Sequence, residues 1–450
     1  MHIITLLIFC SVMLVDWLVK TLTLPPILRF LPDALSGIVV LYVLFAGVRD
    51  RFRLVAPKYW IVFGAMTLVI ICGVIDNQSG VGPLLSGTRF YLRPVPMFFL
   101  PAVLSLSDPQ LRRQLKWLLA LALLQVPVAI YQQYVIQSEG RFTGDDVRGT
   151  VMDSGILTLF LISTVLILTG MFLRRRIRPL TYWLLFFFLL IPTTINETKV
   201  TVIFLPVGLL VTLLFGAERG KKLKYFLMAC GALIVAGGLF IPIYNFTQRY
   251  NPYKNEKDIT AFFTNEKALG KYLSSDVGGL GTKKDVRRGD AIVVPLEFLA
   301  KDPVRLAFGL GLGAVSPSTL GQNFEGEYYL LFEKFSIISF TFFLLELGVF
   351  GVVLIGVLFW MMFSDTLAVA RQDRSLVGVV AAGWIGVVVI YAIDVVYTIF
   401  HEFPSVTYLY WYFAGLICAR CVSLTKDRAK ERVRGRQNPE QGASWSSASP

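Results

Sequence analysis

The sequence predicts an all-α polytopic membrane protein, and three features of its composition support this prediction. Of the 450 residues, 55% are hydrophobic and only 16% are charged, whereas charged residues make up roughly 25% of a soluble protein. The mean hydropathy is +0.64. The hydrophobic residues gather in runs of about 16 to 25, which is long enough for a helix to cross a bilayer at ~1.5 Å per residue.

Twelve apolar windows along the chain are expected to be transmembrane helices. They lie near residues 3–19, 34–48, 59–75, 94–107, 116–134, 154–173, 180–195, 199–216, 225–243, 335–363, 376–397 and 405–420. The fourth window is short and contains Pro94, Pro96 and Pro101, so we expect it to be kinked or partly re-entrant. The tenth contains Glu346-Leu347-Gly348, and we expect a break in that helix.

The windows divide the chain into four parts. Residues 1–243 carry spans one to nine, residues 244–334 form one large external helical loop, and residues 335–420 carry spans ten to twelve. We expect residues 421–450 to be a basic, disordered cytoplasmic tail.

The positions of the basic residues predict the orientation. Basic clusters follow every even-numbered span, at 49–58, 112–116, 174–178, 219–224, 371–374 and 420–436. The positive-inside rule therefore places both termini in the cytoplasm and the long loop outside. The net charge of +13 reports this orientation and contact with anionic lipids, and it does not indicate binding to nucleic acid.

Basic residues on the outer side are scarce under this rule, so those that occur there are candidates for binding a substrate. Arg89 and Arg93 are four residues apart, which would place both guanidinium groups on one face of a helix. Several guanidinium groups that converge would hold a diphosphate, because each matches phosphate oxygens in a bidentate manner. Alternatively, each reaches lipid headgroups or pairs with a nearby acid. The candidates are Arg89, Arg93, Arg141, Arg148, Lys199, Arg287 and Arg288.

Acidic residues supply the candidate general bases. Glu325 and Glu327 lie in FEGEYY, just before the chain re-enters the membrane, where partial burial would raise a carboxyl pKa and suit it to accept a hydroxyl proton. The alternative is that they are interface acids bonded to neighbouring tyrosines. Inside apolar segments, Glu346 is expected to cap the helix break, and Asp394 lies close to His401 and Glu402 and could face a cavity.

Several classes of site are excluded or disfavoured. The chain has only two histidines, so we expect neither a histidine-rich metal site nor any cofactor. The glycines of FGLGLG, residues 308–313, lack the context of a dinucleotide fingerprint. A tight turn or a close approach of the backbone to the membrane is the expected reason for them.

At this point the chain resembles the superfamily of O-antigen polymerases and O-antigen ligases of bacterial polysaccharide assembly. The resemblance covers most of the chain. It rests on many spans and a late external loop that reads Arg288, then AKDPVRLAFGLGLG, then an acidic segment running into FFLLELGVFG. Upstream, TRFYLRP, LLQVPVAIYQQY, DDVRGT and NETKVTVIFLP look like the arginine-containing outer edges of the family.

The resemblance implies metal-independent glycosyl transfer at the outer face of the bacterial plasma membrane. The donor would be an undecaprenyl-diphosphate-linked oligosaccharide and the acceptor a lipid-linked repeat unit. Arg288 and Arg287 would contact the donor diphosphate, helped by Arg89 or Arg93, and a chain-length regulator is a further candidate partner. Ligases of the superfamily carry a histidine in the loop where this chain has Glu325 and Glu327, so the polymerase is favoured over the ligase.

Two alternatives stay open at this point. One is a ligase-type glycosyltransferase that passes the glycan to an acceptor other than the lipid carrier. The other is a transporter or flippase of lipid-linked oligosaccharides, which would be expected to show internal repeats and charged or broken helices at mid-membrane.

Overall fold

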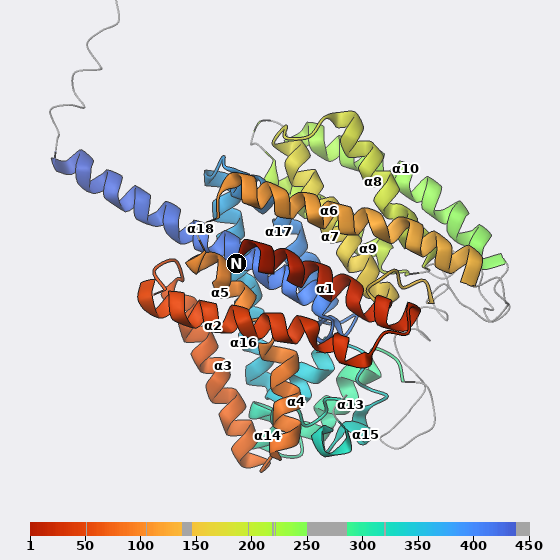
Figure 1. Cartoon of the computed structure of the whole chain (residues 1–450), viewed down its shortest axis with the longest axis vertical. Helices are drawn as coiled ribbons and strands as arrows, with labels where there is room; N and C mark the ends of the chain where they lie inside the picture. Colours follow the sequence, from red (N-terminus) through yellow and green to blue (C-terminus); the bar gives the residue numbers. More distant parts are fainter. Residues whose placement is uncertain are drawn as a thin grey trace, which may run out of the picture.

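The computed structural model describes residues 1–50, 52–104, 106–136, 146–196, 198–217, 220, 222–249, 286–318 and 321–437 (Figure 1). These ranges form helices joined by turns and contain no strand. The α-helices are α1 (His2–Thr21), α2 (Leu31–Asp50), α3 (Pro57–Asp76), α4 (Val81–Leu92), α5 (Pro96–Val103), α6 (Asp108–Tyr131), α7 (Ser154–Leu173), α8 (Pro179–Ile195), α9 (Thr201–Gly216), α10 (Lys222–Arg249), α13 (Asp290–Leu299), α14 (Pro303–Phe308), α15 (Tyr329–Phe332), α16 (Ser339–Gln372), α17 (Leu376–Asp394) and α18 (Pro404–Gln437). Short 3-10 helices are η1 (Pro26–Phe30), η6 (Gln322–Phe324) and η7 (Phe400–Glu402), and η2 (Gln132–Ile136) is a π-helical turn.

Seven helices of the described chain are long and apolar enough to cross a membrane: α1, α2 together with η1, α3, α6, α7, α16 and α17. Three shorter apolar helices accompany them, namely α8, α9 and the part of α10 from Leu223 to Val235. The chain therefore has the architecture of a multi-pass helical membrane protein. The number of twelve spans and the external position of the loop stay predictions.

Helices α7 and α17 form the centre of the bundle. They are apolar on all sides, as expected of helices without a solvent face, and 89% and 78% of their most apolar windows are buried within the protein. A Cβ atom added to Gly170 of α7 would lie 2.8 Å from Cα of Gly383 in α17. The two backbones therefore touch where both helices have glycine, a common way for membrane helices to associate.

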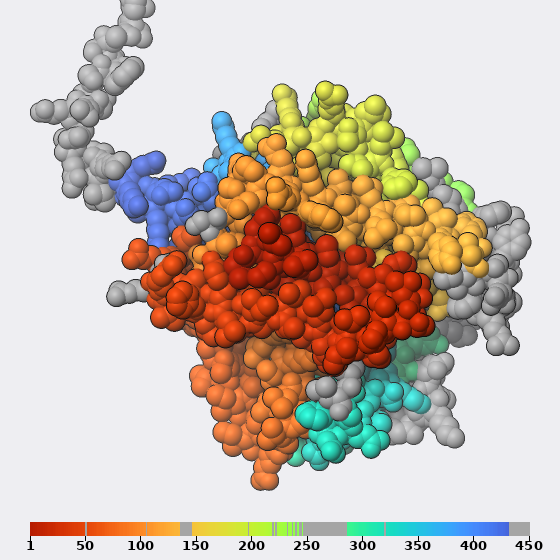
Figure 2. All heavy atoms as spheres, in the orientation of Figure 1, coloured from red at the N-terminus to blue at the C-terminus, as the bar shows by residue number. Residues whose placement is uncertain are grey.

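The other helices surround this central pair. In the space-filling view, α1 and α2 cover the middle of the visible face, with α6 directly above them (Figure 2). Helices α3, α4 and α14 lie together at the bottom of Figure 1, whereas α8 and α10 lie at the top. Because α14 contacts α3 and α16, the described part of the loop is attached to one side of the bundle.

Two of the expected helix breaks occur. The fourth predicted window, 94–107, contains the eight-residue helix α5, and a break at residues 93–95 separates this helix from α4, which ends at Leu92. Helix α16 is interrupted at Gly348, where φ is +64° and the backbone leaves the helical conformation. A left-handed conformation of this kind is accessible to glycine at low cost.

The expectation for the C-terminal tail is wrong in part. Helix α18 continues to Gln437 and extends away from the bundle at the left of Figure 1, so residues 421–437 are helical rather than disordered. This stretch contains Ala429, Lys430 and Glu431 among several arginines. These residue types have high helix propensity, which prolongs a helix already started inside the bundle.

The glycine run after α14 lies against three other helices, α3, α4 and α16. Gly309, Gly311 and Gly313 all have positive φ. A Cβ atom added to Gly309 would lie 2.6 Å from the backbone nitrogen of Gly348 in α16, and one added to Gly87 of α4 would lie 2.6 Å from Cα of Gly313. A Cβ atom on Gly73 of α3 would lie 3.2 Å from Cα of Gly311. The backbone of the run therefore approaches other helices closely, and each of its glycines meets a glycine of a different helix, whereas the predicted approach to the membrane stays a prediction.

Candidate functional site

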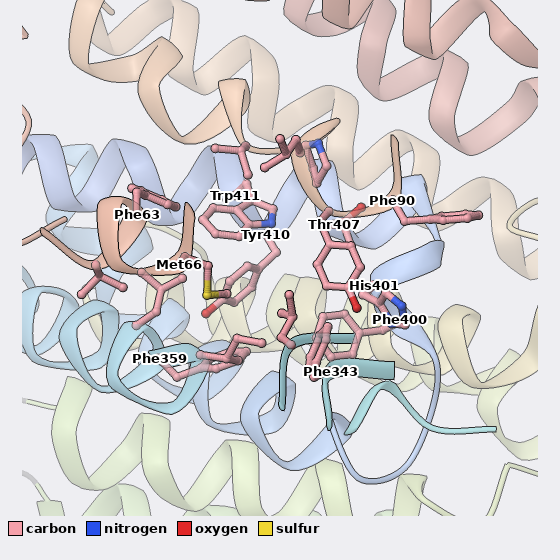
Figure 3. A pocket seen from close by; sticks show the side chains of 18 of the residues that line it. Phe63, Met66, Phe90, Phe343, Phe359, Phe400, His401, Thr407, Tyr410 and Trp411 are labelled. Carbon is pink, nitrogen blue, oxygen red and sulfur yellow. The ribbon is translucent and has the colours of Figure 1, made fainter. Parts of the chain in front are cut away.

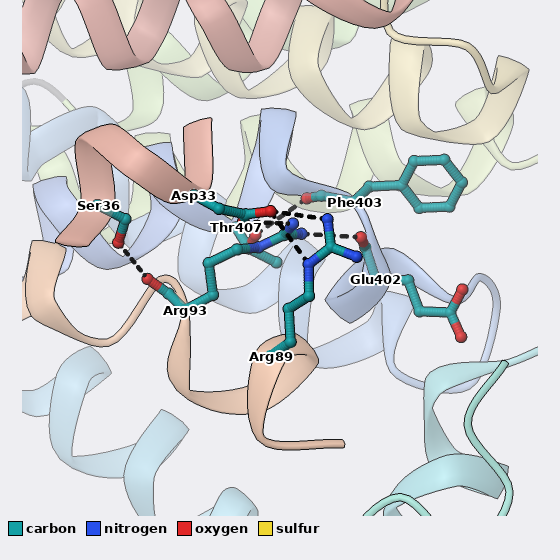
Figure 4. Close-up of polar contacts among 7 residues, drawn as sticks. All are labelled: Asp33, Ser36, Arg89, Arg93, Glu402, Phe403 and Thr407. Carbon is teal, nitrogen blue, oxygen red and sulfur yellow. Dashed lines mark hydrogen bonds and ion pairs between the residues drawn. The ribbon is translucent and has the colours of Figure 1, made fainter. Parts of the chain in front are cut away.

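Arg89 and Arg93 point the same way, as their spacing predicted, and both pair with one carboxylate, which is the alternative considered for them (Figure 4). Both lie at the end of α4, and Asp33 at the start of α2 accepts from Arg89 Nε at 3.1 Å, from Arg89 Nη2 at 2.7 Å and from Arg93 Nη1 at 3.0 Å. Arg93 also donates to the backbone oxygen of Glu402 at 3.4 Å, and only 9% of its side chain is exposed. Because one carboxylate serves two guanidinium groups, these three side chains together carry a net positive charge.

Arg288 lies beside the same connection between α17 and α18. Its Nε donates to the backbone oxygen of Tyr397 at 3.2 Å, and its guanidinium carbon lies 4.3 Å from the centre of the Tyr397 ring. The chain covers at most ~3.6 Å per residue, so the oxygens of Tyr397 and Glu402 are at most ~18 Å apart. Residues 395–403 therefore hold Arg288 at one end and Arg93 at the other.

A group of buried polar atoms lies under this connection. The Tyr91 hydroxyl and the Glu346 carboxyl, from α4 and α16, face each other within hydrogen-bonding reach. Oε1 of Glu402 in η7 is buried without a hydrogen-bond partner, and its carboxyl interacts electrostatically with both groups. Buried polar atoms are paired in most proteins, so the unpaired oxygen of Glu402 marks a position that a ligand or water completes.

The environment of Glu402 favours its neutral form. Burial raises the pKa of the Glu402 carboxyl to about 8, and the nearby Glu346 carboxyl adds to the shift, while Arg93 opposes it. The neighbouring His401 is the opposite case, since burial lowers its pKa to about 3. Its Nδ1 lies 3.0 Å from the hydroxyl oxygen of Ser339. His401 is therefore a neutral ring at physiological pH.

Glu346 joins the membrane helix to the loop. Its Oε1 accepts from the hydroxyl of Ser316 at 2.7 Å and from the backbone N–H of Val315 at 3.2 Å. These two residues directly follow the glycine run. Instead of only capping the helix break, as the sequence suggested, Glu346 fixes the loop against it.

The two glutamates predicted as bases differ in position. Glu327 is exposed and Glu325 is half-buried. Burial raises the pKa of the Tyr329 hydroxyl, and Glu333, Glu325 and Glu402 each raise it further. Tyr329 is therefore within electrostatic range of both Glu325 and Glu402, which places Glu325 near the buried group. Whether Glu325 or Glu327 is a base stays a prediction.

The remaining predicted residues lie around this centre. Arg287 precedes α13, and its backbone N–H donates to Asp290 at 3.1 Å. Arg148 pairs with the neighbouring Asp146 at 3.0 Å, which agrees with the local pairing considered for it. Lys199 is half-buried in the turn before α9. Arg141 lies outside the described residues.

Two aspartates, Asp153 and Asp394, interact electrostatically with Arg148 and Arg288, respectively. Burial raises the pKa of Asp153, the N-cap residue of α7, while Arg148 lowers it. Asp153 and Arg288 both interact electrostatically with Asp394, which accepts from the Thr398 hydroxyl at 2.7 Å. Asp394 thus lies near Arg288 and Asp153, and its position facing a cavity stays a prediction.

An apolar cavity of about 120 Å³ lies next to the polar centre. Its wall includes Tyr91 and His401 at one end and continues along aromatic side chains from α3, α16 and α18, such as Phe63, Phe359 and Trp411 (Figure 3). A second apolar hollow, of about 550 Å³, lies between α16 and α17 and shares Phe343, Ile355 and Phe359 with the first. The two hollows therefore adjoin through a shared part of their walls.

Sequence reasoning missed the role of Glu402 and underestimated that of Glu346. Two signals were present: a carboxyl within an apolar segment, and a turn that combines the internal histidine with a glutamate. Within the described ranges, no group of three or more histidine, cysteine, aspartate or glutamate side chains has the arrangement of a metal site. No known protein family matches the chain by its family model, and no curated protein matches it.

Proposed function

We propose that the chain is a membrane glycosyltransferase of the polysaccharide polymerase type. It transfers a glycan from an undecaprenyl-diphosphate-linked donor to a lipid-linked repeat unit at the outer face of the bacterial plasma membrane. One observation carries the proposal: Arg93 and Arg288 donate to the backbone oxygens of Glu402 and Tyr397, Arg89 shares Asp33 with Arg93, and Oε1 of Glu402 is buried without a hydrogen-bond partner.

The arginines suit a diphosphate leaving group. Negative charge grows on the diphosphate as the glycosidic bond breaks, and fixed cations in a site of low dielectric stabilise that charge strongly. Arg89 and Arg93 are held in place by Asp33 before the substrate arrives. This preorganisation avoids the cost of ordering two long side chains during the reaction.

The carboxyl group suits activation of the acceptor. In the transfer step, the acceptor hydroxyl oxygen attacks the anomeric carbon, the bond from that carbon to the diphosphate oxygen breaks, and the diphosphate leaves with the electron pair. A carboxylate takes the hydroxyl proton. We assign this role to Glu402, because a base whose pKa lies near the working pH is the most effective one. Glu325, which like Glu402 interacts electrostatically with Tyr329, is the second candidate for it.

The adjoining apolar hollows suit the lipid part of the substrate. The first begins at Tyr91 and His401, next to the arginines and Glu402, and the second opens between α16 and α17. A polyprenyl chain that lies in this space would hold the diphosphate at the polar centre. The tail is already surrounded by hydrocarbon in the bilayer, so this space would position the diphosphate rather than add hydrophobic binding energy.

The test uses purified full-length protein and a lipid-linked repeat unit, with the product sized by gel electrophoresis. We expect Arg93→Ala to lower the rate of chain lengthening ~10²–10³-fold, the usual loss when one such donor is removed. Arg93→Lys should keep part of the activity, because the charge stays while the bidentate geometry is lost. Arg29→Ala is the matched control, since Arg29 forms only a half-exposed pair with Asp16 at 3.7 Å.

Other outcomes would identify the alternatives or reject the assignment. Products that end on an acceptor other than the lipid carrier would identify a ligase. Movement of substrate across liposomes without lengthening would identify a transporter. Normal lengthening by a well-folded Arg93→Ala protein would remove the central support for the assignment of this site.

A further inference from the structure

A second hollow with a different character lies at the basic end of α6, α7 and α8. It has a volume of about 570 Å³, which falls in the range of small-molecule sites. Four basic side chains line it: Arg112 and Lys116 from the start of α6, and Arg175 and Arg176 from the turn after α7. Leucine side chains such as Leu115 and Leu118 form an apolar floor. The hollow is therefore basic at its mouth and apolar beneath.

The charges in this hollow are not balanced by the protein. Asp108 is the only acidic residue that lines it. Within the described chain, Arg112, Lys116 and Arg175 form no ion pair, and Arg176 donates only to the backbone oxygen of Arg374 at 3.4 Å. Three positive charges therefore remain in excess around the hollow, where they attract an anion.

The backbone at Arg175 points to a role for its side chain. Arg175 follows α7 and has φ +54°. In this turn the Arg175 N–H donates to the backbone oxygen of Phe172 at 2.9 Å, and the Arg176 N–H donates to the backbone oxygen of Met171 at 2.8 Å. This is the hydrogen-bond pattern of a Schellman C-cap, in which glycine is the usual residue at the left-handed position. Arginine is strained there, and the same turn would form more easily without its side chain.

We propose that this hollow binds the phosphate headgroup of an anionic membrane phospholipid, with an acyl chain along the leucine floor. The phosphate oxygens meet the guanidinium groups of Arg112 and Arg175 and the ammonium group of Lys116, which match them in charge and geometry. The apolar floor favours a lipid over free phosphate, because a free ion would leave that surface in contact with water. None of the residues assigned to the proposed glycosyl transfer lines this hollow. The proposal is therefore independent of the proposed function.

The test uses purified full-length protein in detergent and measures unfolding temperature and lipid retention by native mass spectrometry. Phosphatidylglycerol, phosphatidylcholine with the same acyl chains, and inorganic phosphate are added separately. We expect phosphatidylglycerol alone to raise the unfolding temperature and to stay bound. Arg175→Gly should bind it about fivefold more weakly, which corresponds to ~1 kcal/mol per basic residue near an anionic lipid.

The Arg175→Gly variant separates binding from folding. Without lipid it should unfold at the same temperature as the natural chain or at a higher one, because glycine relieves the strained turn. Arg112→Gln should weaken binding to a similar extent, whereas Arg371→Gln, an exposed residue of α16 that does not line the hollow, should not. Equal binding of phosphatidylglycerol by all variants, or equal stabilisation by phosphatidylcholine or inorganic phosphate, would overturn the proposal.

Discussion

Replacement of Glu346 by alanine tests how the loop is attached to the bundle. In the structure, Oε1 of Glu346 accepts two hydrogen bonds from the loop, from the Ser316 hydroxyl and the Val315 N–H. All three residues are buried. Alanine would leave both donors without an acceptor, and a buried donor left in this state costs ~1–3 kcal/mol. The expected loss is therefore ~2–6 kcal/mol for the two donors together.

The assay is thermal unfolding of the purified protein in detergent, combined with limited proteolysis after residue 316. We expect Glu346→Ala to unfold several degrees below the natural chain and to be cleaved faster in the loop. Glu346→Gln keeps an oxygen in the acceptor position and should lose much less stability. Glu327→Ala is the control for loss of an exposed acid, and such a change is expected to cost less than ~0.5 kcal/mol. Equal unfolding temperatures for Glu346→Ala and Glu327→Ala, or equal damage from alanine and glutamine at 346, would refute this reasoning.

Three further predictions follow from other contacts. Burial raises the pKa of Glu402 from 4.5 to about 8, so the folded state keeps a proton on this carboxyl over a pH range in which the unfolded state has lost it. The stability of the protein should therefore fall as pH rises from about 4.5 to 8. Glu402→Gln should remove this slope when unfolding temperature is measured across that range, and an unchanged slope would contradict the prediction. Burial would raise the pKa of Asp373, but Arg420, whose Nε lies 2.8 Å from the Asp373 carboxylate, outweighs burial and lowers that pKa. The Asp373→Asn variant should therefore be less stable than the natural chain at pH 7, and the difference in stability should narrow as pH falls below about 4. A difference that does not depend on pH would contradict this prediction. Gly87→Ala should cost ~1–3 kcal/mol in the same assay, because its Cβ would press on the backbone of Gly313, and an unchanged unfolding temperature would show that the loop can move away.

The sequence was most informative where local spacing decides the structure. The four-residue spacing of Arg89 and Arg93 placed both guanidinium groups on one face of α4. The prolines around residue 94 and the glycine at 348 marked the two helix breaks. In each case the cause lies within one or two helical turns, so no knowledge of the tertiary structure was needed.

The sequence could not show which distant groups meet. Asp33 binds arginines that are 56 and 60 residues away in the chain, and Arg93 reaches the backbone of Glu402 across 309 residues. The burial of Glu402 depends on α4, a helix much earlier in the chain that contacts η7. Its immediate neighbours, His401 and Phe403, do not show by themselves that the carboxyl is buried.

The contact between Gly309 and Gly348 has a consequence for protein engineering. The loop backbone and the interrupted part of α16 fit each other with no room for a side chain on either partner, and the N–H of Leu310 donates to the oxygen of Leu345 at 2.6 Å. The loop is therefore not an exchangeable module. A chimera that imports a foreign segment for residues 286–338 would have to import the beginning of the next helix, up to about residue 351, to assemble correctly.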